Sequence, residues 1–227
     1  MSGIYSITPF SLLDFPDHIS CIIWFAGCNM RCLYCYNPEI VFGNAQLEEE
    51  NVLDFLNKRK HLLEGVVLSG GECTLYPKLI ELCAKIKKLG YRIKIDTNGC
   101  RPKIIKQLIN ESLIDYVALD YKAPLKKFKS ITQSKLNFGL FAETLEFLCV
   151  QNDIKFEVRT TVHSTLLQNE DIQTIQNHLK KLGYKYKHYL QCFKNDVEII
   201  GNLNQSNNNF LTNYFIKTLP VRTEIRT

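Results

Sequence analysis

Long apolar runs are missing from this sequence, and so is the pattern of a secretory leader. The first ten residues have no basic flank followed by an apolar core, and no apolar stretch reaches the length of a bilayer-spanning helix. We therefore expect neither export nor membrane insertion, and predict a cytoplasmic protein without a membrane partner.

The sequence also lacks an even set of cysteines and any interdomain linker. Nine cysteines argue against a closed disulfide framework and are too many to serve only as space fillers, so some are expected to bind metal. With 227 residues, 45% of them hydrophobic, the chain can bury one sizeable core. We predict a single domain over residues 1–227, with a core at about 11–195 and a C-terminal extension at about 196–227.

A concentrated basic surface is not evident either. The net charge of +5 comes from lysines scattered over expected helices, where solvated faces are the ordinary explanation. No nucleic-acid partner is predicted.

Short β-branched runs alternate with longer stretches of helical period, which is typical of parallel strands joined by crossover helices. The expected strands are His18–Phe25, Gly65–Ser69, Tyr91–Asp96, Tyr116–Asp120, Lys155–Val162 and Tyr186–Cys192. The expected helices are Leu47–Arg59, Pro77–Leu89, Pro102–Glu111, Gly139–Asn152, Asn169–Leu182 and a short Phe210–Ile216, after a mobile surface loop at Gly201–Asn209. Periodicity predicts an α/β fold but leaves open whether the sheet is doubly wound or part of a barrel.

Three cysteines follow the first expected strand at spacings of four and three residues: Cys28, Cys32 and Cys35. A four-iron cluster ordinarily takes four thiolates, so a loop with three leaves one iron open to a substrate. The alternative is a zinc site completed by Cys21 or Cys73, or a non-catalytic iron-sulfur module. Zinc knuckles usually come as two Cys-x-x-Cys pairs, and a second pair is absent here.

This loop, with aromatic Tyr34 before the last cysteine, resembles the signature of the radical S-adenosylmethionine (SAM) superfamily. The longer string from Phe25 to Asn37 resembles the activating enzymes of glycyl radical proteins, especially the activating proteins of anaerobic ribonucleoside-triphosphate reductase that are similar to pyruvate formate-lyase activase. The resemblance implies a partial (β/α)6 barrel. It also implies a [4Fe–4S] cluster on the three cysteines and SAM as cofactor.

The expected strands end at polar residues that would meet at one edge of the sheet. Gly70 and Gly71 allow close backbone approach, and Glu72 adds a carboxylate suited to an amino group. The resemblance assigns these three residues to the amino group of SAM. Glycines kept only for the geometry of a turn are the alternative.

Asp96 and Asp120 end successive strands, and two buried carboxylates require positive charge nearby. By resemblance Asp96, Thr97 and Asp120 are candidate ligands of a monovalent cation beside SAM. A salt bridge with Lys122 or Arg159 is the alternative.

The resemblance further implies SAM contacts at Tyr34, Asn37, Asp96, Asn98, Lys122 and Arg159. Two other aromatic side chains are interpreted differently: Trp24 is expected in the core and His163 on the surface. Tyr36 stands where pyruvate formate-lyase activases usually have histidine, which favours the reductase type.

The activity implied is reductive cleavage of SAM to a 5′-deoxyadenosyl radical, which takes a hydrogen atom from a glycine of a partner enzyme. That partner is expected to be anaerobic ribonucleotide reductase, with flavodoxin or ferredoxin as the electron donor. A small-molecule radical SAM enzyme such as 7-carboxy-7-deazaguanine synthase stays open as an alternative.

Overall fold

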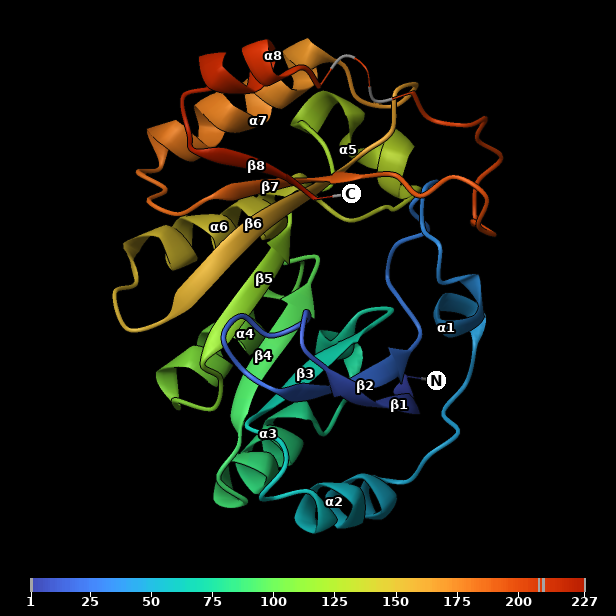
Figure 1. Ribbon diagram of the computed structural model, residues 1–227, viewed down its shortest axis with the longest axis vertical. Helices are drawn as coiled ribbons and strands as arrows, with labels where there is room; N and C mark the ends of the chain where they lie inside the picture. The colour runs from blue at the N-terminus through green and yellow to red at the C-terminus, as the bar shows by residue number, and fades with distance from the viewer. Residues whose placement is uncertain (1, 208, 210, 227) are drawn as a thin grey trace.

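A computed structural model describes residues 2–207, 209 and 211–226 of the chain. Eight strands form one sheet and lie side by side in chain order (Figure 1). The strands are β1 (Gly3–Ser11), β2 (Ser20–Ala26), β3 (Gly65–Gly70), β4 (Arg92–Thr97), β5 (Tyr116–Asp120), β6 (Lys155–Val162), β7 (His188–Cys192) and β8 (Thr223–Arg226). β1 pairs antiparallel with β2, and every later pair is parallel.

Helices connect the parallel strands and cover one face of the sheet (Figure 1). They are α1 (Pro38–Phe42), α2 (Glu49–Lys58), the 3₁₀ turn η1 (Cys73–Leu75), α3 (Leu79–Lys88), α4 (Pro102–Asn110), α5 (Leu125–Thr132), α6 (Phe138–Val150), α7 (Asn169–Lys181) and α8 (Asn213–Thr218). Within the described residues β1 and β8 occupy opposite edges of the sheet and do not pair. The result is an open, partial barrel, as expected from the sequence.

Burial explains why the central strands are apolar on both faces. In β3 the side chains of Val66, Val67 and Leu68 are fully buried, because one face of the sheet meets the helices and the other faces the barrel interior. The helices contribute an apolar stripe each. In α3, which lies within the predicted helix Pro77–Leu89, this stripe is formed by Leu82, Cys83 and Ile86.

The six predicted strands are present as β2–β7, but the sequence did not predict β1, β8, α1 or α5. β1 is an edge strand of mixed exposure, and β8 has only four residues, so neither shows a buried run in the sequence. The last helix begins at Asn213 rather than at residue 210, which lies outside the described residues. β8 pairs with β7, so part of the predicted C-terminal extension belongs to the sheet.

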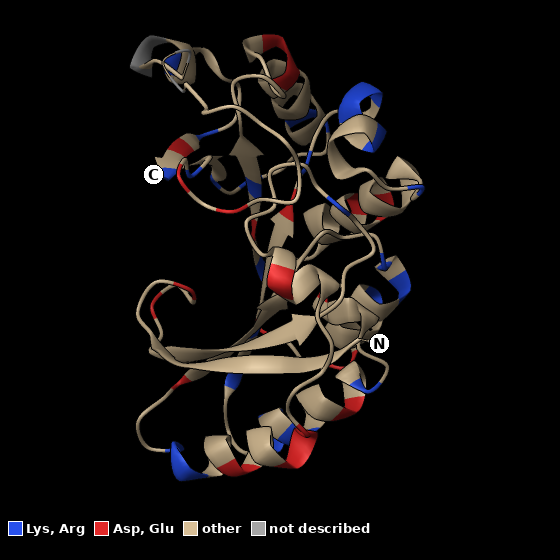
Figure 2. Ribbon diagram, turned by 90° about the vertical axis from the view of Figure 1, so that its right-hand side faces the viewer, with Lys and Arg blue, Asp and Glu red and all other residues tan. Residues whose placement is uncertain are grey.

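Basic residues, drawn blue, and acidic residues, drawn red, are interspersed along the helices in Figure 2. Several helical lysines take part in ion pairs, such as Lys87 with Asp115 and Lys127 with Asp171. Across the part of the chain that is described, no helix combines the length and the apolarity needed to cross a bilayer.

Candidate active site

The carboxyl ends of the parallel strands surround a cavity of about 210 Å³. Strand ends on β3 to β7 and the loop after β2 supply its walls. Except for Glu72, every site residue predicted from the sequence lines it: Cys28, Cys32, Tyr34, Cys35, Asn37, Gly70, Gly71, Asp96, Thr97, Asn98, Asp120, Lys122 and Arg159. Parallel strands bring their carboxyl ends to one edge, which is why residues far apart in the sequence meet here.

The cysteine loop is held in place by backbone hydrogen bonds from two sides. The N–H groups of Arg31 and Leu33 donate to carbonyl oxygens at the end of α5, at 2.8 and 3.0 Å. On another side, the N–H groups of Ile200 and Gly201 donate to the carbonyl oxygens of Cys35 and Leu33, at 3.0 and 2.8 Å. The loop is therefore preorganised by segments distant in sequence.

The contact with Gly201 corrects the prediction for the Asn- and Gly-rich segment, which was expected to be a mobile surface loop. Its first residue lies against the cysteine loop so closely that a Cβ atom would stand 2.5 Å from the Leu33 carbonyl oxygen. Glycine is required there because backbone approaches backbone.

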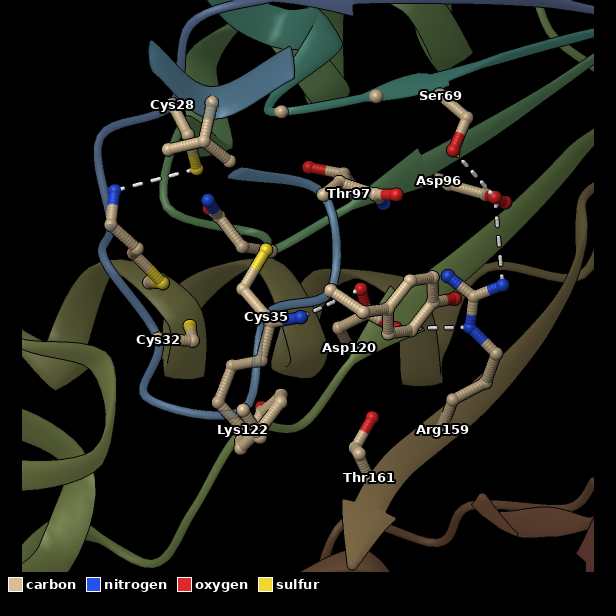
Figure 3. Close-up of a pocket in the computed structure, with 18 of the residues that line it drawn as sticks. Cys28, Cys32, Cys35, Ser69, Asp96, Thr97, Asp120, Lys122, Arg159 and Thr161 are labelled. Atoms are coloured by element: carbon tan, nitrogen blue, oxygen red, sulfur yellow. Dashed lines mark hydrogen bonds and ion pairs between the residues drawn. The ribbon is translucent and has the colours of Figure 1, made fainter. Parts of the chain in front are cut away.

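All nine cysteines of the chain are free thiols. The side chains of Cys28, Cys32 and Cys35 lie on one side of the cavity, and Asp96 and Arg159 lie on the other (Figure 3). Burial raises the pKa of Cys28 to about 12 and that of Cys32 to about 11. Within the described residues no three His, Cys, Asp or Glu side chains are gathered around a single-ion position.

Gly70 and Gly71 pack directly against the strand that leads into the cysteine loop. Gly70 has a φ of 124°, and a Cβ atom on it would lie 2.5 Å from backbone atoms of Phe25. A Cβ atom on Gly71 would lie 2.0 Å from the carbonyl oxygen of Gly27. Both glycines are thus needed for close packing, and both also border the cavity.

Glu72 is placed differently from the sequence prediction. Its side chain is buried and does not line the cavity. The carboxylate accepts hydrogen bonds from the Thr97 hydroxyl at 2.8 Å, from the Asn98 N–H at 2.8 Å, and from both the hydroxyl and the N–H of Thr74. Burial raises the pKa of Glu72, and these hydrogen bonds oppose the increase. In this geometry Glu72 organises the β4 end rather than facing a ligand.

Buried ion pairs form a chain, here called the cavity network: Lys94, Asp96, Asp120, Lys122 and Arg159. All but Lys94 line the cavity, and Figure 3 shows these four. Arg159 joins its two halves, because Nε lies 2.9 Å from Asp120 Oδ1 and Nη1 lies 3.5 Å from Asp96 Oδ2. Lys122 Nζ lies 2.9 Å from Asp120 Oδ2, and Lys94 Nζ lies 2.5 Å from Asp96 Oδ1. The salt-bridge alternative for the two aspartates is therefore what the structure contains.

These ion pairs keep the carboxylates ionised despite burial. Burial alone raises the pKa of Asp96, but the positive charges of Arg159 and Lys94 bring it down to about 2. The pKa of Asp120 is likewise lowered, since Arg159 and Lys122 outweigh burial. The pKa of Lys122 is raised well above its usual range because Asp120 outweighs the effect of burial. The network carries three positive and two negative groups, which leaves one surplus positive charge.

Tyr34, Asn37 and Asn98 complete the predicted contacts around the cavity. The Asn98 side chain bridges to the cysteine loop, with Nδ2 donating to Asn29 Oδ1 at 2.7 Å. The Tyr34 hydroxyl is buried without a well-formed hydrogen bond within the described residues, and its weak interaction with the Cys32 thiol slightly opposes the burial effect there. Lys122 Nζ lies 5.9 Å from the centre of the Tyr34 ring.

Several cavity residues escaped the sequence analysis. Ser69, Thr161 and Gln191 line the cavity from the ends of β3, β6 and β7. Thr161 follows Arg159 by two residues, so strand alternation could have placed it on the inner face. Lys94 has the same relation to Asp96 on β4, and it is almost fully buried.

Two further predictions, for His163 and Trp24, require correction. His163 was expected on the surface but is fully buried, and its Nε2 lies 2.8 Å from the carbonyl oxygen of Asn204. Trp24 was expected in the core but is only partly buried and borders the cavity, with its Nε1 donating to the Thr8 hydroxyl at 2.8 Å. Both errors arise because contacts with distant segments decide the burial of a strand end or a loop.

Comparison with known proteins places this site in a family. The model of the radical SAM superfamily matches residues 22–182. A Methanocaldococcus jannaschii protein assigned as a glycyl-radical enzyme activating enzyme is 35% identical over 188 residues, which cover 79% of this chain and 75% of that protein. The pyruvate formate-lyase-activating enzyme of Clostridium pasteurianum is 31% identical over 192 residues, or 80% of this chain and 78% of that enzyme.

Solved structures with this fold include Streptococcus suis SuiB, with a TM-score of 0.68 and 12% identity. The match covers 89% of this chain and 47% of SuiB, so this chain spans about half the length of SuiB. Escherichia coli QueE matches with a TM-score of 0.57 and 14% identity over 99% of this chain and 94% of QueE. At these identities the likeness concerns the fold, and QueE shows that the fold occurs at nearly this length.

Proposed function

This chain belongs to the radical SAM superfamily and, within it, to the glycyl-radical enzyme activating enzymes, and from that premise we propose that it cleaves SAM reductively and generates a glycyl radical on a partner enzyme. The observation that carries the proposal is the position of Cys28, Cys32 and Cys35. All three thiols are free, and all border one cavity that Lys122 and Arg159 also line.

The residues present fit an iron-sulfur cluster with one open iron. Three thiolates from one loop can each bind a separate iron, and the loop is preorganised by α5 and by the Ile200–Gly201 segment. The raised pKa values of Cys28 and Cys32 mean that these groups are thiols without metal, so binding of the cluster would release their protons. When bound, the cluster would supply the electron for cleavage of the SAM sulfonium.

The chain's own residues would bind SAM, orient it and exclude water. In this proposal Lys122 and Arg159, which line the cavity, attract the SAM carboxylate, while the backbone of Gly70 and Gly71 and the Asp96 carboxylate face its amino group. Tyr34, Asn37 and Asn98 border the remaining space. Glu72 takes part only through Thr97 and Asn98, which it holds in place.

We further propose anaerobic ribonucleotide reductase as the partner and flavodoxin or ferredoxin as the electron donor, on the basis of the sequence resemblance around the cysteine loop. The sheet does not close between β1 and β8 within the described residues, and an unclosed barrel supports a macromolecular substrate. We also propose a single radical SAM domain over residues 1–227, and the pairing of β1 and β8 with the same sheet supports it. Nine free thiols support a reducing, cytoplasmic location.

Anaerobic purification provides the first test of this function. A brown protein with about four irons per chain that cleaves SAM when dithionite is added supports radical SAM chemistry. A colourless zinc protein would contradict it and favour the binding-module alternative.

Electron paramagnetic resonance provides the second test. After mixing with anaerobic ribonucleotide reductase, SAM and reductant, we expect the doublet of a glycyl radical on the reductase. SAM cleavage without a doublet on any glycyl radical enzyme from the same organism would exclude the activase and favour a small-molecule enzyme such as 7-carboxy-7-deazaguanine synthase.

A further inference from the structure

Resemblance to pyruvate formate-lyase activase implies an alkali cation held by Asp96, Thr97 and Asp120, but the oxygen atoms of these residues already have partners. The Thr97 hydroxyl donates to Glu72 and accepts from the Gly99 N–H at 3.1 Å. Asp120 Oδ1 faces Arg159 Nε and Asp120 Oδ2 faces Lys122 Nζ, both at 2.9 Å. Hard cations need several oxygen ligands, and none of these oxygens is free of a donor.

Asp96 is engaged on both oxygens as well. Oδ2 accepts from the Ser69 hydroxyl at 3.0 Å and lies 3.5 Å from Arg159 Nη1. Oδ1 lies 2.5 Å from Lys94 Nζ, and the Lys94 side chain is only 3% exposed. The ammonium group of Lys94 therefore occupies the position next to Asp96 that an alkali ion would need.

Charge balance leads to the same conclusion. The cavity network contains one more positive than negative group before any ligand binds. An alkali ion placed between the two carboxylates would add a further positive charge beside the three cationic side chains of this network, which is unfavourable at a buried position.

We propose that Lys94 is a built-in replacement for the alkali cation, so that this protein binds SAM without a bound Na⁺ or K⁺. Lys94 lies two residues before Asp96 on β4, so both side chains point to the barrel interior. Lys94 is thus a positioning residue, which acts on the ligand through Asp96. The inference rests on the proposed SAM site only where SAM affinity is measured.

The direct test uses crystals of the iron-loaded protein grown with Rb⁺ as the only alkali ion. We expect no anomalous scattering peak between Asp96 and Asp120. A peak there, with Rb⁺ in contact with both carboxylates, would overturn the proposal. This readout needs no SAM cleavage, so its failure is distinguishable from failure of the proposed function.

A binding experiment adds a functional readout. The dissociation constant of SAM is measured in K⁺, Na⁺ or choline buffers of equal ionic strength. For the unmodified protein we expect changes of less than about twofold, because no cation is exchanged. A loss of more than about tenfold in choline would contradict the proposal.

Variants at position 94 sharpen the same experiment. In Lys94→Met the carboxylate of Asp96 loses its ammonium partner, so SAM binding is expected to become dependent on K⁺, with a melting temperature that rises as K⁺ replaces choline. Lys94→Arg keeps the positive charge, so its SAM binding should remain independent of K⁺. Lys106→Met serves as the matched control, because Lys106 pairs with Glu143 on the helical surface, away from the cavity. If Lys94→Met folds and its SAM binding and melting temperature do not depend on K⁺, Lys94 does not replace the ion. If this variant does not fold, the Rb⁺ experiment decides.

Discussion

Two buried polar clusters meet at neighbouring residues of β6, and they differ in what they leave unsatisfied. Arg159 points into the barrel and belongs to the charged cavity network. Thr160 points to the opposite face and belongs to a second cluster, here called the neutral network: Thr160, Gln176, His188 and Thr223. Successive residues of a strand face opposite sides, so one strand serves both clusters.

The neutral network is closed. Gln176 Nε2 donates to His188 Nδ1 at 2.7 Å and to the Thr223 hydroxyl at 2.8 Å, while its Oε1 accepts from the Val221 N–H at 3.0 Å. His188 Nε2 and the Thr160 hydroxyl are 2.9 Å apart. The cluster ties α7, β6, β7 and β8 together, and each of these groups has a protein partner, which is typical of a structural role.

The cavity network is not closed in the same sense. It has one more positive than negative group, and the cavity that four of its five members line is also bordered by three free thiols and by Tyr34, whose buried hydroxyl lacks a well-formed hydrogen bond within the described residues. Comparing the two clusters shows that burial of polar groups alone does not identify a site. The distinguishing features are the unmatched groups that remain for a ligand.

The largest effect is expected from a substitution in the cavity that leaves the neutral network intact. Cys32→Ala removes one of the three thiols that face the cavity, so iron and sulfide in the anaerobically reconstituted protein should fall close to zero. Colorimetric iron analysis and the visible absorption of the cluster measure this. Cys149→Ala, a change on α6 outside the cavity, is the control and should keep its iron. Full iron content in Cys32→Ala would contradict the ligand assignment.

A smaller effect is expected from a substitution of Glu72. This residue lies next to the cavity, but its buried carboxylate, like the groups of the neutral network, has protein partners. Glu72→Gln would turn an amide N–H toward a donor such as the Asn98 N–H, so the free energy of unfolding should fall by about 1 to 3 kcal/mol. Chemical denaturation under anaerobic conditions measures this. Glu143→Gln, on an exposed ion pair, should change it by less than about 1 kcal/mol.

The outcome for SAM distinguishes two roles of Glu72. Normal folding stability together with weakened SAM binding would restore the direct contact with the SAM amino group. Reduced stability, with SAM affinity lowered only alongside it, would support the positioning role seen in the structure.

The last prediction concerns how the neutral network makes the free energy of unfolding depend on pH. Burial lowers the pKa of His188 to about 3, whereas an unfolded histidine takes up a proton near its usual value. Between those values the unfolded state binds more protons, so stability decreases as the pH falls. This single residue should lower the free energy of unfolding by about 2 kcal/mol between pH 7 and pH 5.

Denaturation curves at several pH values check this expectation. His188→Gln should flatten the pH dependence in that interval. An unaltered slope in His188→Gln would show that His188 is not buried in its neutral form.

The local sequence pattern was sufficient to predict site residues that share one loop or that stand at the end of an apolar strand. Cys28, Cys32 and Cys35 share one loop, and Gly70 and Asp96 stand at the ends of apolar runs, so their meeting at the sheet edge could be predicted. Pattern failed where distant contacts decide. The burial of His163 depends on Asn204, and the placement of Gly201 depends on the cysteine loop.

The sequence by itself determined the thiol loop, the order of the strands and the set of polar strand ends, because spacing and hydrophobic period are local properties. Only the tertiary structure decided which charges pair. Lys94, Asp96 and Arg159 come from two strands that β5 separates, and their separations depend on how the sheet curves. The direction of a buried carboxylate, as in Glu72, likewise follows from which donors the fold brings to it, since a buried charge must be satisfied by its neighbours.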